Sequence, residues 1–259
     1  SVVVGSPYNG DNGSDSGNVR VFQWDVFTSS WAQKGSNIVG EAEADNSGWS
    51  VSLSSNANTV AIGARFNAVN GNESGHVRIY YWMDSLGDWI QMGADIDSES
   101  EWDQFGHSVS LSSDGTIVAI GGQSNDSNGQ DAGHVKVYQW VSEMLLWLQM
   151  GDDILGENIG DESGWSVSLS DDGNTLAVGS PGNDDSASDS GHVRIFHWDY
   201  EESNWTQQGT AIEGEAAVDR SGKSVAISGD GSTVLIGSPE NDNSFFQAGQ
   251  ARVFIFGCN

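Results

Sequence analysis

Short apolar segments alternate with polar, glycine-rich segments along this chain, and the alternation recurs as one repeated pattern. In each copy an apolar run ends in glycine, a polar loop follows, and a second apolar run begins after another glycine. The first of these glycines recurs every 58 residues without insertion or deletion, at Gly5, Gly63, Gly121, Gly179 and Gly237. Short strands repeated at one fixed period indicate a propeller-like array.

Each full copy contains four strand-like segments. In the third copy they are residues 106–111, 117–121, 134–140 and 147–151, named here the inner, second, third and outer strands. Asp114 and Gly115 join the first two, and this pair favours a tight hairpin because both residues tolerate positive φ. Four antiparallel strands per repeat form a propeller blade. We therefore predict an all-β fold, a β-propeller of four-stranded antiparallel blades.

The repeat copies form a single predicted β-propeller domain over 1–259, with about five blades. Second and third strands occur five times but inner and outer strands only four times, so the first and last blades are incomplete. Unpaired strand edges are templates for association. We therefore expect the chain to assemble with itself or with a missing continuation of the chain, with Cys258 near the junction. The copies are 1–47, 48–105, 106–163, 164–221 and 222–259.

Tryptophans recur on the third and outer strands, while small residues recur on the inner and second strands. Blades pack face to face, so the small positions of one blade can receive the large side chains of its neighbour. We interpret eight of the tryptophans as core residues, with an aromatic sugar-binding stripe as the alternative. They are Trp24, Trp82, Trp140, Trp198, Trp31, Trp89, Trp147 and Trp205.

The repeats resemble FG-GAP-type propeller repeats, which occur in integrin α-subunit heads and in many secreted microbial and algal proteins. Residues 103–109 match the family's Asp-x-Phe-Gly-x-Ser-Val opening, and Gly-Ser-Pro at 5–7, 179–181 and 237–239 stands where the family has Gly-Ala-Pro. The resemblance covers essentially the whole chain and implies a propeller used for adhesion, scaffolding or binding. The family's calcium loops do not carry over, because turns such as 114–115 cannot supply six to eight oxygen ligands.

The charge is strongly acidic, with 37 Asp and Glu against 9 Lys and Arg and a net charge of −28. This balance argues against nucleic-acid binding, which relies on phosphate neutralisation. The remaining interpretations are solubility in a salty extracellular medium and cation capture. No apolar run approaches the roughly 18 residues that a membrane span needs.

Two loops between second and third strands concentrate hard oxygen ligands, and they predict weak calcium binding. The alternative for their asparagines is an Asx turn that shapes the loop. The stronger loop contains Asn183, Asp184, Asp185 and Asp189, and the weaker contains Asn125, Asp126 and Asp131.

Two further series follow the repeat near the same face, and we expect them to form structural Asp–Arg or Asp–Lys pairs. A ring of carboxylates at the channel mouth is the alternative. The series are Asp45, Asp103, Asp161 and Asp219, and Arg20, Arg78, Lys136, Arg194 and Arg252. Three recurring histidines, His76, His134 and His192, lie on third strands about 18 Å apart by strand spacing. They cannot share one metal ion, and we interpret them as strand-entry residues.

Residues that break the repeat indicate where recognition occurs. Exposed aromatics among carboxylates and amides suit carbohydrate or peptide ligands, although two of them, Phe245 and Phe246, would equally well cover the open side of the last blade. The predicted ligand-binding residues are Trp102, Phe105, Arg65, Phe66, Phe245 and Phe246.

We expect a secreted, non-enzymatic propeller for extracellular binding or adhesion, because the chain lacks the G-x-S-x-G, H-E-x-x-H and phosphate-loop motifs. The alternatives are a structural subunit of an extracellular assembly or filament and, less favoured, a hydrolase on a propeller scaffold. The expected partner is an extracellular protein or carbohydrate. Four N-glycosylation sequons fit a glycoprotein, and the start without Met fits a processed or excised product. The sequons are at Asn12, Asn72, Asn125 and Asn204.

Overall fold

The computed structural model describes residues 1–242, 245 and 248–256. This part of the chain folds into 22 strands that form five antiparallel sheets, and none of its residues is helical. It therefore contains no helix long and apolar enough to cross a membrane. The prediction of an all-β propeller of antiparallel blades is confirmed.

The three middle sheets are complete blades. In each, the four strands pair in chain order, and a fifth, two-residue strand pairs with the start of the third strand. The second blade contains β5 (Ser50–Leu53), β6 (Thr59–Ala64), β7 (His76–Met83), β8 (Asp88–Gln91) and β9 (Ile96–Asp97). The third contains β10 (Ser108–Leu111), β11 (Ile117–Gly122), β12 (His134–Val141), β13 (Leu146–Gln149) and β14 (Ile154–Leu155). The fourth contains β15 (Ser166–Leu169), β16 (Thr175–Ser180), β17 (His192–Asp199), β18 (Asn204–Gln207) and β19 (Ile212–Glu213).

The two end sheets are shorter. The first contains β1 (Val2–Ser6), β2 (Asn18–Asp25), β3 (Ser30–Gln33) and β4 (Ile38–Val39), and it has no inner strand. The fifth contains β20 (Ser224–Ile227), β21 (Thr233–Ser238) and β22 (Gln250–Ile255), without an outer strand in the described part.

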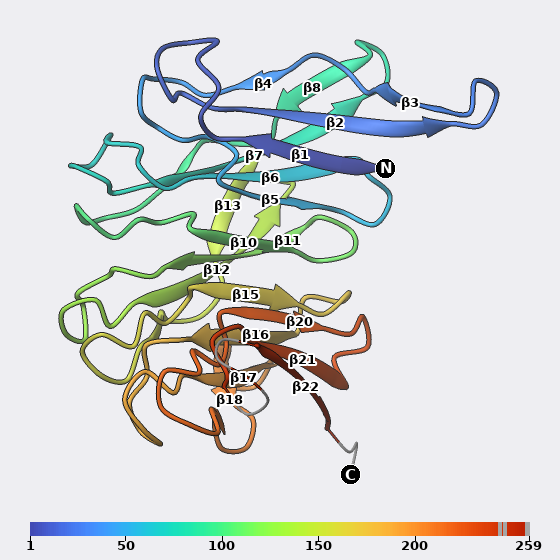
Figure 1. Cartoon of the computed structure of the whole chain (residues 1–259). Coiled ribbons are helices and arrows are strands. Elements are labelled where there is room, and N and C mark those ends of the chain that lie inside the picture. Colours follow the sequence, from blue (N-terminus) through green and yellow to red (C-terminus); the bar gives the residue numbers. More distant parts are fainter. Residues whose placement is uncertain (243–244, 246–247, 257–259) are drawn as a thin grey trace.

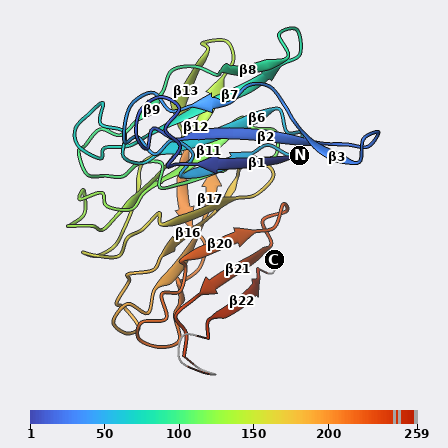
Figure 2. The ribbon, with the colours of Figure 1, turned by 45° about the horizontal axis from the view of Figure 1, so that its top comes forward.

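The five blades follow one another in an arc, with the first at the top of Figure 1 and the fifth at the bottom. Each inner strand packs against that of the next blade, from β5 through β10 and β15 to β20. Figure 2 shows the same succession from a tilted view. The loops between second and third strands and those that lead into inner strands gather on one side, at the left of Figure 1. We call this side the loop face.

The repeated glycines allow neighbouring blades to approach closely. Gly121 on β11 faces Gly164, which precedes β15, and a Cβ on Gly121 would stand 2.0 Å from the Gly164 carbonyl oxygen. Beside this contact, the Ser108 hydroxyl donates a hydrogen bond of 2.7 Å to the same carbonyl. Equivalent pairs join the other interfaces, as between Gly63 and Gly106. The small residues of the repeat are thus explained by contact between blade backbones.

The repeated tryptophans form one pair in each of the first four blades, and from the second blade on they connect each of these blades to the preceding one. Trp82 and Trp89, like the other three pairs, have ring centroids 5.5 Å apart. The Trp89 indole N–H donates to the Lys34 carbonyl of the first blade, and Trp147 and Trp205 do the same one and two blades later. Their core role is clear in the inner blades. In the first blade, which has no preceding neighbour, Trp24 and Trp31 are about half exposed.

The predicted Asp–Arg pairs do not form among the described residues. The buried Asp161 carboxylate accepts hydrogen bonds from the Asn183 amide and from the Asn158 backbone instead. Arg194 donates to the Leu155 carbonyl and to the Ser163 hydroxyl. The expectation is wrong because amides and backbone N–H groups satisfy an aspartate such as Asp161, while the basic residues lie near other carboxylates, as Arg194 does near Glu157 at 3.9 Å.

Candidate functional site

A row of large side chains lies where the loop face meets the inner strands. Trp49, His107, Trp165 and Lys223 each directly precede an inner strand and occupy the same position of the repeat. The Trp49 and His107 ring centroids are 5.9 Å apart, and those of His107 and Trp165 are 4.7 Å apart. Lys223 continues the row, with its ammonium 5.4 Å from the Trp165 ring. We call these four residues the inner row.

Arg65 covers one end of this row. It follows β6, and its guanidinium lies 3.3 Å from the Trp49 ring centroid and 4.3 Å from that of Phe66. Its Nη1 stands 3.5 Å from His107 Nδ1. Within the described residues no carboxylate lies within 4.0 Å of this guanidinium, and its buried Nε has no hydrogen-bond partner there. Arg65 is thus a partly buried cation between two aromatic rings, without a counter-ion.

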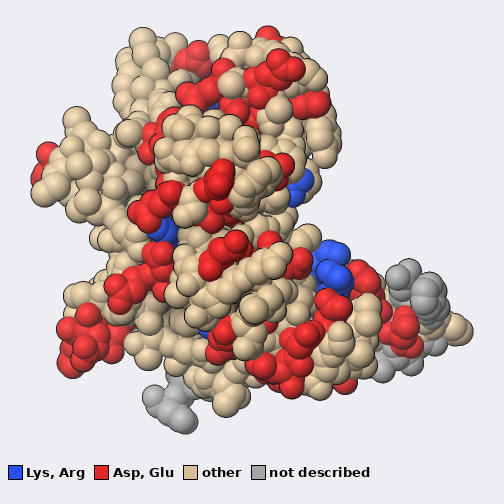
Figure 3. Space-filling model, turned by 90° about the vertical axis from the view of Figure 1, so that its left-hand side faces the viewer, with Lys and Arg blue, Asp and Glu red and all other residues tan. Residues whose placement is uncertain are grey.

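The opposite end of the row carries more charge. Arg220 is 3.6 Å from both Asp189 and Glu240, and Lys223 is 3.5 Å from Glu240. On the loop face as a whole, basic side chains are few among many acidic ones (Figure 3). Because Arg220 and Lys223 are already neutralised, Arg65 is the cation of this region that is most available to an anionic ligand.

His107 is neutral at ordinary pH. Burial lowers its pKa to about 4, and the neighbouring Arg65 cation contributes in the same direction. A neutral imidazole can accept a proton from a bound group, and the adjacent guanidinium can stabilise a developing negative charge. The pair has the chemistry of a base beside an anion-stabilising group.

Next to Arg65, Phe66 and Trp102 line a hollow of about 440 Å³ on the loop face, together with Ala44 and Glu73. Trp102 is half exposed, at 50%, and has a φ of 69°. Large side chains rarely adopt this left-handed conformation. Its backbone N–H donates to the Asn72 carbonyl, which holds the loop in place. The hollow therefore adds an apolar surface beside the Arg65 guanidinium.

The structure brings together only part of the predicted ligand-binding set. Arg65, Phe66 and Trp102 are neighbours, and Phe245 is 81% exposed on the last blade. Phe246 lies outside the described residues. Phe105 requires a correction, because it is fully buried in the core and packs on His134. It belongs to the repeat motif and cannot contact a ligand.

Sequence reasoning missed most of the inner row. The signal was present, because eight of the 11 tryptophans were accounted for as blade core and the other three are Trp49, Trp102 and Trp165. All three lie on the loop face, beside Arg65 or along the row that starts there. His107 also breaks the repeat, because the same position holds Trp49, Trp165 and Lys223 in the other copies, so the sequence offered a signal for it as well.

The two acidic loops are shaped by their own side chains. Asn183 is buried, and its Oδ1 accepts the Asp185 N–H, while Asp184 accepts the Asp189 N–H. In the weaker loop the same bonds join Asn125 to Ser127 and Asp126 to Asp131. The asparagines thus make Asx turns, which was the alternative to calcium binding in the sequence analysis. Calcium binding by the remaining oxygens stays a prediction.

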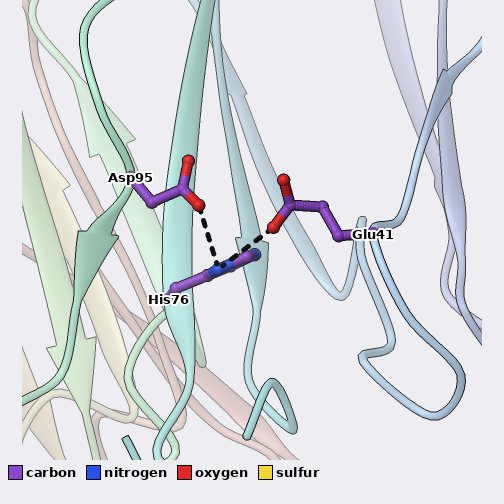
Figure 4. A group of neighbouring side chains, drawn as sticks. All are labelled: Glu41, His76 and Asp95. Atoms are coloured by element: carbon purple, nitrogen blue, oxygen red, sulfur yellow. Dashed lines mark ion pairs between the residues drawn. The ribbon is translucent and has the colours of Figure 1, made fainter. Parts of the chain in front are cut away.

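Two groups of acidic residues and histidine could hold a metal ion among the described residues. They are Glu41, His76 and Asp95, shown in Figure 4, and Glu157, Asp185 and His192. In both, the ligand atoms lie within 4.8 Å of one another. The histidines share no ion among themselves, but each of these two meets carboxylates from its own repeat and from the repeat before. The sequence interpretation considered only an ion shared among the histidines, and not an ion held by one histidine with carboxylates.

Comparison with known proteins supports the repeat assignment. Residues 157–196 match the family model of the FG-GAP repeat. No curated protein matches the chain.

Solved structures with the same fold include enzymes. The periplasmic gluconolactonase PpgL of Pseudomonas aeruginosa is similar over 99% of this chain and 68% of its own, with a TM-score of 0.55 and 15% identity. A protein described as a putative 6-phosphogluconolactonase of Bacteroides uniformis is similar over 98% of this chain and 77% of its own, with a TM-score of 0.49 and 11% identity.

The similarity to PpgL corrects the expectation that the chain is not an enzyme. The expectation rested on missing motifs, yet the PpgL fold spans almost the whole of this chain in a protein described as a gluconolactonase. The architecture is therefore one on which hydrolases are built, and a lack of short motifs does not exclude catalysis. The chain is a β-propeller repeat protein that carries an FG-GAP repeat at residues 157–196.

Proposed function

We propose that this chain is a secreted propeller that binds an extracellular acidic carbohydrate on its loop face, at Arg65, Trp49 and Phe66. The observation that carries the proposal is the Arg65 guanidinium. It lies between two aromatic rings and lacks a counter-ion within the described residues, although the molecule has a net charge of −28. An unpaired, partly buried cation on such a molecule calls for an anionic group.

The chemistry around Arg65 favours a sugar acid over other anions. A guanidinium binds carboxylate or sulfate through two parallel hydrogen bonds. The rings of Trp102 and Phe66 line the adjoining hollow, and aromatic faces pack well on the apolar face of a sugar ring. Long polyanions would meet the surrounding carboxylates, so we expect binding to depend on one well-placed acidic residue of the carbohydrate.

The test compares two oligosaccharides of equal length, one of galacturonic acid and one of glucose, by titration calorimetry. We expect the acidic one to bind and the neutral one not to bind. Arg65→Ala should weaken binding at least tenfold, and Arg65→Lys should weaken it partly, because lysine keeps the charge but not the bidentate geometry.

Lys34→Ala is the matched control. Lys34 also lies over two tryptophan rings, at 4.7 and 5.3 Å, but it belongs to the end of β3 and not to the loop face. Its replacement should leave the affinity unchanged. Equal binding of the two oligosaccharides, or full affinity in Arg65→Ala, would contradict the proposal.

A second candidate function is hydrolysis of a sugar lactone at the same place. It is favoured by the neutral His107 imidazole beside the Arg65 guanidinium, an arrangement suited to activating water and stabilising the negative oxygen of the attacked ester. Gluconolactone is the appropriate probe, followed by acid release at constant pH. Turnover that is lost in His107→Gln would support this function, and a rate equal to the uncatalysed one would exclude it for this substrate.

A further inference from the structure

His76 is fully buried at the start of β7, yet neither of its ring nitrogens has a hydrogen-bond partner in the described part of the chain. Leaving a buried polar group without a partner costs about 1–3 kcal/mol. Such groups are rare and call for an explanation. The explanation here lies in what surrounds the ring.

Three carboxylates converge on one nitrogen of His76. Asp97 lies directly opposite His76 in the pairing of β9 with β7, and Asp95 precedes β9 by one residue. Glu41 approaches from the first blade, just after β4. Their oxygens lie 3.7, 3.9 and 4.0 Å from His76 Nδ1, for Asp97, Asp95 and Glu41 in that order. Figure 4 shows Asp95 and Glu41 pointing toward the ring from two sides.

These separations are too long for hydrogen bonds, but they suit atoms that share an ion. In a tetrahedral site with bonds of 2.0–2.1 Å, neighbouring ligand atoms stand roughly 3.3 Å apart. The ligand atoms of Glu41, His76 and Asp95 lie within 4.8 Å of one another, so movements of roughly 1 to 1.5 Å would close these three around an ion. Asp97 lies outside this set and would have to turn further. The carboxylates can make these movements, because the side chains of Glu41, Asp95 and Asp97 are 42%, 26% and 33% exposed. The same exposure leaves the ion a path from solvent.

The local charge calls for a divalent cation. Arg78 Nη1 lies 3.5 Å from the other Glu41 oxygen, Oε1. One guanidinium against three carboxylates leaves a formal charge of −2, and Glu41 Oε2 remains available. A neutral imidazole nitrogen together with carboxylate oxygens suits zinc, whereas calcium and magnesium prefer oxygen ligands alone.

We propose that His76, Asp95, Asp97 and Glu41 bind a zinc ion that connects the first blade to the second. The site is independent of the Arg65 region and of the proposed carbohydrate. It also lies apart from the two acidic loops for which calcium binding is predicted.

The third and fourth copies of the repeat show why the second copy is special. In the third, the Lys136 ammonium lies 3.4 Å from Glu99 and 3.5 Å from Asp153, so a fixed cation already fills the equivalent place. Leu155 stands there in place of Asp97.

In the fourth copy two carboxylates lie within 4.0 Å of His192, one at each ring nitrogen, and Asp185 of the same group lies farther from the ring. Glu157 approaches Nε2 at 3.9 Å, and Glu213 approaches Nδ1 at 4.0 Å. Of the three histidines at this repeat position, only His76 therefore has three carboxylates within 4.0 Å of one ring nitrogen.

The test is titration of the metal-depleted whole chain with zinc and, separately, with calcium, followed by calorimetry. We expect one tight zinc ion per chain and a zinc-dependent rise in melting temperature, because an ion bound only by the folded state stabilises it. His76→Gln should weaken zinc binding at least 100-fold. His134→Gln, the matched control at the lysine-filled copy, should retain the ion.

Because His76 is buried, its replacement could also disturb the fold. The double variant Asp95→Asn and Asp97→Asn changes only partly exposed side chains, and it should lose the zinc while circular dichroism stays unchanged. Cobalt(II) offers a second readout, because a four-coordinate site gives a visible absorption band that both variants should abolish. Zinc retained by the double variant, or lost instead in His192→Gln, would overturn the proposal.

Discussion

At the scale of single residues, the basic side chains fall into two groups, those that belong to the repeated blade structure and those that lie at the proposed binding site. Five of the nine follow the repeat on third strands, and Lys34 lies near the end of β3. The other three break the repeat, and all of them lie along the inner row. They are Arg65, Arg220 and Lys223. Because their repeat positions hold other residues in the other copies, the sequence alone shows that they are exceptional, but not that they meet.

The His76 group illustrates what the sequence could not show. It depends on β9, a strand of two residues that pairs with β7 and places Asp97 opposite His76. It also depends on the approach of Glu41 from the first blade. Hydrophobic periodicity does not reveal a two-residue strand or a contact between blades. The sequence interpretation therefore treated the recurring histidines as strand-entry residues.

His107 gives a prediction about pH. Its pKa is about 4 in the folded protein and 6.5 in a free chain, so the unfolded state binds more protons between these values. Stability should therefore fall as the pH drops from 6.5 toward 4. At pH 4.5 His107 alone should account for roughly 2–3 kcal/mol of the loss.

The measurement is urea unfolding of the wild type and of His107→Gln at pH 7.5 and 4.5. The variant should lose less stability between the two pH values, although His134 and His192, whose pKa burial also lowers to about 4, continue to contribute. An equal loss in both proteins would show that His107 is already accessible to protons in the fold.

At the scale of elements, the blade was predictable because each local signal agrees with the others. Residues 117–121 were predicted as a second strand, and β11 spans Ile117–Gly122. The hairpin at Asp114-Gly115 and the core position of the tryptophans also agree with the prediction from the sequence. What failed was the pairing of charged side chains, since Asp161 and Arg194 found backbone and amide partners at closer range.

The close approach of blades gives a prediction about glycine. In Gly179→Ala the added methyl would stand 2.0 Å from the Gly222 carbonyl oxygen, so the backbones of two blades would have to separate. We expect a loss of at least 1–3 kcal/mol in the free energy of unfolding, which is typical of overpacking.

Gly10→Ala is the control for this change. Its added methyl would meet nothing closer than 3.6 Å, at the Gly13 carbonyl oxygen. Its effect should stay within about 0.5 kcal/mol, as for most exposed positions. Thermal and urea unfolding measure both. Equal stability of the two variants would mean that the blades are not held by this contact.

At the scale of the whole molecule, the two end blades expose apolar faces that inner blades cover. Val2 and Val4 on β1 are 41% and 38% exposed, whereas the equivalent Val60 and Ile62 on β6 are fully buried. On the fifth blade, Val253 and Ile255 are 62% and 77% exposed. At each inner interface, one such face of a blade packs against the opposite face of the next blade. The first blade leaves one of these two faces uncovered, and the fifth blade leaves the other uncovered.

From these faces we predict that the chain associates head to tail, the first blade of one copy against the fifth blade of another. Light scattering should show a mass that rises with protein concentration. Val253→Glu combined with Ile255→Glu should lower that mass without lowering the melting temperature. A monomer at all concentrations up to about 1 mM would contradict this prediction.

The most direct test of the account's central claim, that Arg65 and the inner row form the binding site, is a nuclear magnetic resonance titration of the indole N–H signals with the galacturonic acid oligosaccharide. We predict shifts for Trp49, which contacts Arg65, and for Trp102 in the adjoining hollow. Signals of the buried Trp89 and Trp205, whose N–H groups are bonded to the preceding blade, should not move. Binding that shifts neither Trp49 nor Trp102 would contradict the account.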